Sequence, residues 1–174
     1  MLSDYTDLKE LARLAAAILT VDTTVLFLAR YFPQWIGVKT LNDWYDQFGI
    51  VAVLSDCLVI LLVFIIARYI YSFLGLKHNL FLFLLLVVAL QVLHDVFFYV
   101  AVIKPIPRGH NKMIDVFKNY ADENGAQIIV GDAGLMLASA AIAILFNSQP
   151  DHVVVAATTV VGYALTYILY TKRQ

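Results

Sequence analysis

The chain alternates between long apolar stretches and short polar connections. A helix needs about 20 mostly apolar residues to cross the hydrocarbon core of a bilayer. Five stretches meet that length and predict membrane-spanning helices, at about residues 11–32, 48–74, 80–103, 126–146 and 153–170. The first is the least apolar, because Arg13 and Asp22 interrupt it. The pattern therefore predicts an all-α, polytopic membrane helix bundle that forms a single transmembrane domain over residues 1–174.

The longest polar connection, residues 104–125, carries its own helical pattern. Met113, Ile114, Phe117 and Tyr120 share one face, and charged residues occupy the other, namely Lys112, Asp115, Lys118, Asp122 and Glu123. This pattern predicts a short amphipathic helix, capped by Asn111 and lying on the membrane surface. The simpler interpretation is a connector that rides on the membrane. The more specific one is a docking face for a soluble partner, formed by Met113, Ile114, Phe117 and Tyr120 with Lys112 and Lys118.

Residues that begin and end helices lie beside the apolar stretches. Ser3, Thr6 and Asp7 are suited to cap the first helix. Thr40 with Asp43 resembles a capping box, so we expect the second helix to start in water and enter the membrane later. Gly75 and Gly125 stand where helices are expected to end. A tight turn is expected at residues 147–150, between the last two spans.

Composition agrees with the membrane assignment and excludes other classes. The 174 residues are 61% hydrophobic and only 14% charged, more apolar than soluble domains. A formal net charge of −1 argues against nucleic acid as a partner. The single cysteine, Cys57, allows no intrachain disulfide. Acidic residues precede the first apolar stretch, so we interpret that stretch as a retained span and not as a cleaved signal.

The basic residues predict an orientation. Five spans place the two chain ends on opposite sides of the membrane. Lys and Arg number four on the side of the N-terminus, at positions 9, 13, 68 and 77, against eight on the other side, at 30, 39, 104, 108, 112, 118, 172 and 173. The side with more positive charge normally faces the cytoplasm. We therefore expect a cytoplasmic C-terminus.

Each of the first four spans contains one aspartate: Asp22, Asp56, Asp95 and Asp132. Counted from the cytoplasmic side, Asp22 lies 8 residues before Arg30 and Asp95 lies 8 before Ile103, while Asp56 lies 8 after Phe48 and Asp132 lies 6 after Ala126. At about 1.5 Å per residue they share a layer roughly 9–12 Å below one interface. Gln91 and His94 belong to the same layer, and Gln91 precedes Asp95 by four residues, the spacing at which two side chains hydrogen-bond along a helix.

Three interpretations of this polar layer remain open. The acids form a structural belt that holds the bundle together, or line a path for protons or cations, or hold a metal ion with His94 in a membrane enzyme. We rank the belt first and the enzyme last, because one histidine is a poor basis for zinc. Motifs of common enzymes are absent from the sequence. The sequence therefore predicts no catalytic residue, no cofactor and no metal.

A resemblance to a known group is carried by two stretches, NDWYDQFGIVAVLSDCLVILLVFIIARYIY and LQVLHDVFFYVAVIKPIPRGHNKMIDVFKNYADENGAQIIVGD. Within them, WYDQFG, the HD pair, PRGHN and DVFKNYADENG are the features concerned. They resemble small multi-spanning membrane proteins of nucleocytoplasmic large DNA viruses, such as the algal giant viruses. The resemblance spans residues 42–132 and leaves the first and fifth spans out.

What the resemblance implies is a structural role in a virion. Such viruses hold an internal membrane, derived from a host internal membrane, beneath an icosahedral shell. A protein of this kind is expected to anchor that bilayer to minor capsid or other virion proteins, with its cytoplasmic side facing the shell. The expected partners are thus the lipid bilayer and capsid proteins, and homo-oligomerisation stays open.

Overall fold

The computed structural model describes residues 2–36, 39–76 and 79–171, and every regular element among them is helical. The elements are α1 (Leu8–Tyr31), α2 (Pro33–Ile36), α3 (Lys39–Phe48), α4 (Ile50–Phe73), α5 (Leu80–Phe98), a π-helix (Tyr99–Ile103), α6 (Lys112–Asn124), α7 (Gln127–Asn147) and α8 (Asp151–Leu169). Five of them are long and apolar enough to cross a membrane: α1, α4, α5 with its π-helix, α7 and α8. The predicted all-α, polytopic bundle is confirmed.

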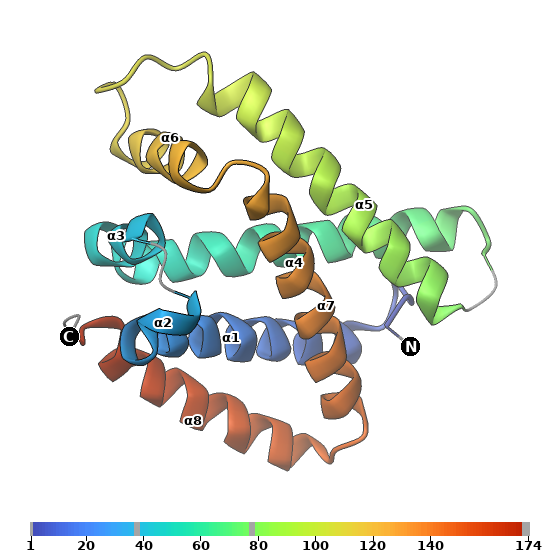
Figure 1. Ribbon diagram of the computed structural model, residues 1–174. Coiled ribbons are helices and arrows are strands. Elements are labelled where there is room, and N and C mark those ends of the chain that lie inside the picture. The colour runs from blue at the N-terminus through green and yellow to red at the C-terminus, as the bar shows by residue number, and fades with distance from the viewer. Residues whose placement is uncertain (1, 37–38, 77–78, 172–174) are drawn as a thin grey trace.

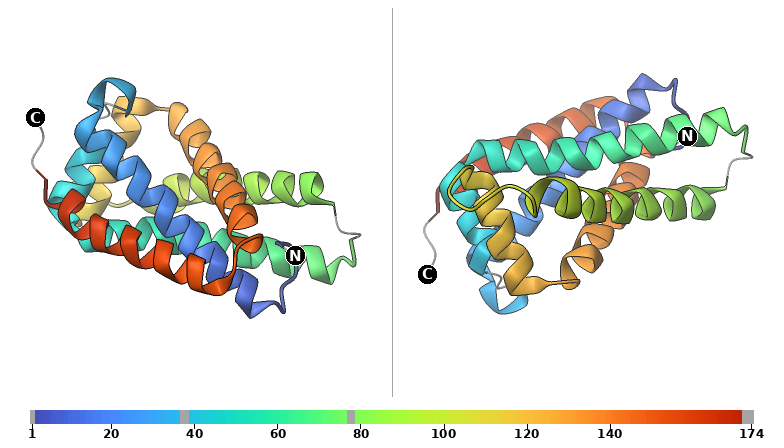
Figure 2. Two further views of the ribbon diagram at one scale, coloured as in Figure 1. Left: turned by 90° about the horizontal axis from the view of Figure 1, so that it is seen from below. Right: turned by 90° about the horizontal axis from the view of Figure 1, so that it is seen from above.

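Helix α1 lies at the centre of the bundle (Figure 1). It packs against α4, α7 and α8, while α5 packs against α4 and α7. Helix α7 crosses the others obliquely, which both views in Figure 2 show. Helix α1 starts and helix α8 finishes at opposite ends of the bundle, as an odd number of spans requires.

Two buried clusters hold the bundle together. The larger lies where α1, α4, α5 and α7 meet and contains Leu14, Phe64, Phe83 and Met136, each at most 1% exposed. The smaller cluster contains Trp44, Val53 and Leu165 and lies toward the end of the bundle at which α8 finishes. Many of the other large apolar side chains in the spans point outward, including Leu58, Phe81, Phe97, Val155 and Tyr163. An apolar outer surface on helices of this length is what contact with lipid hydrocarbon requires.

Helices α3 and α6 form a second layer across one end of the bundle, which we call the end platform (Figure 1). The two helices contact each other, and α3 also contacts α1 and α4. Contrary to the expectation of one second helix running from Thr40 into the membrane, α3 and α4 are separate helices. Gly49 separates them with a φ of +53°, a conformation that favours glycine.

The predicted helix ends are otherwise largely confirmed. Asp7 caps α1 by accepting a hydrogen bond from the Glu10 amide at 3.0 Å. Asn111 caps α6 through the amides of Met113 and Ile114. Gly75 and Gly125 follow helix ends with positive φ. The π-helix that closes the third span was not predicted; there the amide of Lys104 bonds to the carbonyl of Tyr99, five residues back.

Candidate functional site

Two of the intramembrane aspartates receive hydrogen bonds from neighbouring residues of α3. The Tyr45 hydroxyl donates to Asp22 Oδ1 over 3.1 Å. The Trp44 indole nitrogen donates to both carboxylate oxygens of Asp56, over 3.2 and 3.0 Å. Trp44, Tyr45 and Asp22 are all buried. Consecutive residues of the end platform thus reach two acids on different spans, α1 and α4.

Local packing explains why α3 presents these two donors. The Trp44 ring lies 4.8 Å from that of Phe117 on α6 and 4.9 Å from that of Phe48. Burial first, and then the charges of Asp56 and Asp22, raise the pKa of Tyr45 well above its ordinary value of 10.0. Tyr45 therefore keeps its proton and remains a donor at any physiological pH.

Asp95 on α5 has partners on its own helix. Gln91 Nε2 donates to Asp95 Oδ1 over 2.7 Å, as the four-residue spacing predicted, and His94 Nδ1 lies 3.2 Å from the same oxygen. Asp95 Oδ2 and Gln91 Oε1 are buried without a hydrogen-bond partner. The His94 side chain is 33% exposed, and its ring stacks on that of Phe98. The hydrogen-bonded pair of Gln91 and Asp95 is therefore shielded on the side of Gln91 and more accessible on the side of His94.

Asp132 on α7 completes the set of predicted acids. It is partly buried and lies within electrostatic range of both Asp95 and Asp56. Asp56 in turn lies within range of Asp22. Tyr120 on α6 lies within electrostatic range of Asp132, Asp56 and Glu123, and burial first, then these charges, raise its pKa to about 12. Each of the four aspartates is thus within electrostatic range of at least one other.

A metal centre receives no support from this arrangement. Over residues 2–36, 39–76 and 79–171, no three side chains of His, Cys, Asp or Glu gather in a group that could hold a metal ion. His94 and Asp95 are adjacent, but two donors fall short of the three protein ligands of most catalytic zinc sites.

The apolar face of α6 is turned toward its own chain. Ile114 is buried, while Met113, Phe117 and Tyr120 are partly buried. Met113 and Phe117 pack on the cluster that contains Trp44, and the Phe117 ring also meets Phe98, 6.3 Å away. The predicted docking residues of this face therefore join α6 to the bundle.

Polar side chains of α6 hold the preceding loop against the helix through hydrogen bonds. Lys118 Nζ donates to the carbonyl of Ile106 over 2.5 Å, and Asp115 accepts from the Gly109 amide over 2.9 Å. Arg108 reaches Asn119 and Asp122 over 2.7 and 2.8 Å. Of the predicted docking residues, only Lys112 is exposed. The PRGHN motif thus has a structural use, which is to fasten this loop.

Two buried arginines make structural contacts that sequence reasoning missed. Arg30 was counted only toward the orientation of the chain, yet its side chain is 0% exposed. It bonds to Asp46 over 2.6 Å, to Asn42 Oδ1 over 3.0 Å and to the carbonyl of Leu169 over 3.4 Å. Arg68, 1% exposed, donates to the carbonyls of Asp4 and Asp7. The available signal was that each arginine lies within an apolar helix.

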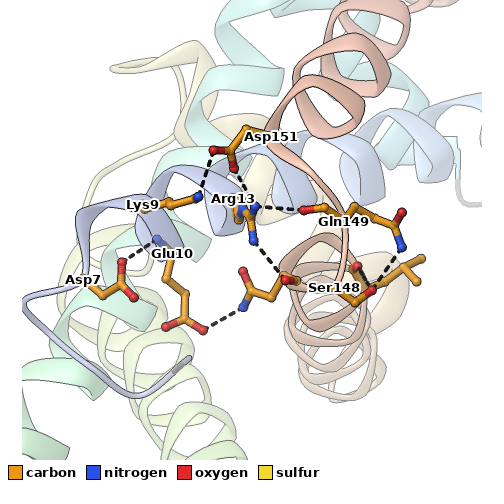
Figure 3. A network of polar contacts seen from close by, with 9 residues as sticks. Asp7, Lys9, Glu10, Arg13, Ser148, Gln149 and Asp151 are labelled. Atoms are coloured by element: carbon orange, nitrogen blue, oxygen red, sulfur yellow. Dashed lines mark hydrogen bonds and ion pairs between the residues drawn. The ribbon is translucent and has the colours of Figure 1, made fainter.

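A polar network ties the opposite end of the bundle (Figure 3). Arg13 donates to the carbonyls of Asn147 and Gln149 and pairs with Asp151 over 2.5 Å, and Lys9 also pairs with Asp151. The Asn147 side chain donates to Glu10 over 2.7 Å. A cavity of about 270 Å³ lies beside Arg13, Glu10 and Asn147. The arginine that weakened the first span in the sequence thus fixes the turn between α7 and α8.

Comparison with protein-family models, curated proteins and solved structures finds no match to the chain. The viral resemblance therefore depends on the two sequence stretches alone.

Proposed function

We propose that the chain is a structural, non-catalytic integral membrane protein that anchors a viral inner membrane to the surrounding icosahedral shell. The viral setting comes from the sequence resemblance. The structural role is supported by one observation above all, the donation of Trp44 and Tyr45 to Asp56 and Asp22. Acids at membrane depth are costly, and here two of them secure the end platform to the spans.

The end platform is the proposed contact with the shell. Further contacts fix it, since Arg30 of α1 reaches Asn42 and Asp46, and Glu123 of α6 binds the start of α3. A rigid platform loses little conformational entropy when it binds a partner. The polar outer side of α6 and the surroundings of Trp35, which is 70% exposed on α2, lie at this end and are accessible. We place this end on the cytoplasmic, shell-facing side, together with the C-terminus.

Site-specific photocrosslinking tests this role. A photoreactive residue at Lys112, exposed on α6, is expected to crosslink to a capsid protein in assembled particles. The same residue at His152, exposed at the other end of the bundle, is the matched control and is expected to give no capsid crosslink. Crosslinks to lipid alone, or capsid crosslinks from His152 and not from Lys112, would remove the proposal. Crosslinks between copies of this chain alone would replace shell contact with self-association.

Position 112 is a better probe than the apolar face of α6. Polar replacements of Met113, Phe117 and Tyr120 would disturb the packing of α6 on its own bundle, so that defective assembly would report misfolding as readily as a lost contact. A probe at an exposed position leaves the fold intact and makes the outcome specific to the surface.

A further inference from the structure

Two buried acceptor oxygens on neighbouring side chains of α5 have no hydrogen-bond donor. Gln91 is only 3% exposed, and its amide nitrogen donates to Asp95 Oδ1 over 2.7 Å. Its amide oxygen and Asp95 Oδ2 are both buried, and neither has a partner. A buried acceptor without a donor costs about 1–3 kcal/mol, so two in one pair call for an explanation.

A proton on Asp95 supplies what is missing. A carboxylic acid and an amide form a cyclic pair, in which the amide N–H donates to one carboxyl oxygen and the acid O–H donates to the amide oxygen. The first of these bonds is present between Gln91 Nε2 and Asp95 Oδ1. The second needs a hydrogen on Oδ2, which an ionised carboxylate does not have.

We propose that Asp95 and Gln91 form a proton-binding site in the third span, in which the proton is carried by Asp95 Oδ2 and shared with the Gln91 carbonyl oxygen. Binding converts the carboxylate to the neutral acid, and one hydrogen bond to Gln91 forms. The ligand is the proton alone: it forms the O–H bond on Asp95 Oδ2, and no covalent bond is broken in the protein.

Neighbouring groups favour this assignment. His94 Nδ1 lies 3.2 Å from Asp95 Oδ1, so the tautomer with hydrogen on Nδ1 gives Oδ1 a second donor and leaves Oδ2 as the oxygen that carries the proton. The other titratable groups near the pair are Tyr99, four residues beyond Asp95 in the π-helix, Asp132 on α7 and, within electrostatic range of Asp132, Asp56 on α4. Nearby negative charge and a low-dielectric setting both favour the neutral acid.

A proton suits the pair better than a metal cation does. In the part of the chain that the structure describes, no third His, Cys, Asp or Glu joins Asp95 and His94 in a group fit for a metal. The His94 side chain is 33% exposed, so the buried pair has one partly exposed neighbour. The inference is independent of the proposed anchoring role, since it concerns α5 and not the end platform.

Infrared spectroscopy of the full chain in lipid vesicles tests the site. At neutral pH we expect a carbonyl-stretch band of a protonated carboxyl group that shifts in heavy water and is lost in Asp95→Asn. In Gln91→Leu the band is expected at higher frequency, because the carbonyl loses its amide donor. Asp22→Asn, which removes an acid bound to Tyr45, is the matched control. It should keep the part of the protonated-carboxyl band that shifts in Gln91→Leu.

Two outcomes would overturn the proposal. One is a spectrum in which no protonated-carboxyl band responds to either Asp95→Asn or Gln91→Leu. The other is a band that appears only after Na⁺, K⁺ and Ca²⁺ are removed, which would assign the site to a metal cation. If Asp95→Asn fails to insert, the frequency shift in Gln91→Leu decides the question. A missing band combined with intact crosslinking from position 112 would refute the proton site and leave the anchoring role standing.

Discussion

At the scale of single residues, surroundings decide what an arginine contributes. Arg30 and Arg108 each reach two side chains, a carboxylate and an amide oxygen. The Arg30 side chain is fully buried, whereas that of Arg108 is 53% exposed. Exposed ion pairs contribute little because water competes for both charges. Removing one member of a buried ion pair leaves the other charge without its partner, which destabilises the fold.

We therefore predict different losses of stability for Arg30→Met and Arg108→Met. Arg30→Met should lower the free energy of unfolding by about 2–3 kcal/mol, somewhat less than a fully buried pair, because Asp46 is half exposed and regains water. Arg108→Met, the matched control, should cost less than about 1 kcal/mol. Unfolding in detergent micelles measures both. Equal losses in the two variants would show that the Arg30 contacts do not stabilise the bundle.

At the scale of elements, α3 depends on a residue more than 80 positions away in sequence. Glu123 of α6 accepts hydrogen bonds from the backbone amides of Lys39 and Thr40, over 3.3 and 3.0 Å, and from the Thr40 hydroxyl. Amides at a helix start have no partner within the helix and favour a negative charge. Glu123 thus caps a neighbouring helix and joins the two halves of the end platform.

This capping predicts a pH dependence. Hydrogen bonds from Thr40, first its hydroxyl and then its amide, hold the pKa of Glu123 below its ordinary value of 4.5. A lowered pKa in the folded state stabilises the protein above that ordinary value, and the contribution is lost as the pH falls through the folded pKa. Hydrogen-exchange protection of the Lys39 and Thr40 amides should therefore fall as the solution is acidified below 4.5.

The variant Glu123→Gln provides the control for this dependence. At neutral pH it should lower the protection of these two amides about two- to fivefold, the range expected for one charge at a helix start. It should also remove their extra loss of protection in acid. Unchanged protection in Glu123→Gln would mean that the carboxylate does not hold the start of α3.

At the scale of the whole molecule, the arrangement of the spans fits one orientation. Helix α1 starts at one end and α8 finishes at the other, where the end platform lies (Figure 1). Membrane insertion acts on the chain before tertiary packing, so Arg30 and Arg68 count toward orientation although both become buried. The balance of four basic residues against eight therefore still applies.

We predict that a tag at the C-terminus faces the cytoplasm and a tag at the N-terminus faces the opposite compartment. Replacing Lys39, Lys104 and Lys112 by Gln removes three of the eight charges and leaves five against four, which should yield a mixed orientation. Protease protection of both tags in sealed vesicles measures the result. Tags that emerge on one side would contradict the five-span arrangement itself.

The sequence by itself determined the features that depend on local spacing. The length and apolarity of the spans follow from bilayer thickness, and the Asp7 and Asn111 caps follow from hydrogen bonds within one turn. The contact between Gln91 and Asp95 was also predictable, because residues four apart lie on the same face of a helix. Such features need no knowledge of the neighbouring helices.

Only the tertiary structure decided which faces meet. An apolar helix face looks the same in sequence whether it meets lipid, a partner or its own chain, so Met113, Phe117 and Tyr120 indicated an amphipathic helix without indicating where it lies. The partners of Asp22, Asp56 and Arg30 come from other helices and depend on how those helices are rotated and tilted. Local periodicity carries no information about that rotation, because burial of the same apolar surface is satisfied by several arrangements.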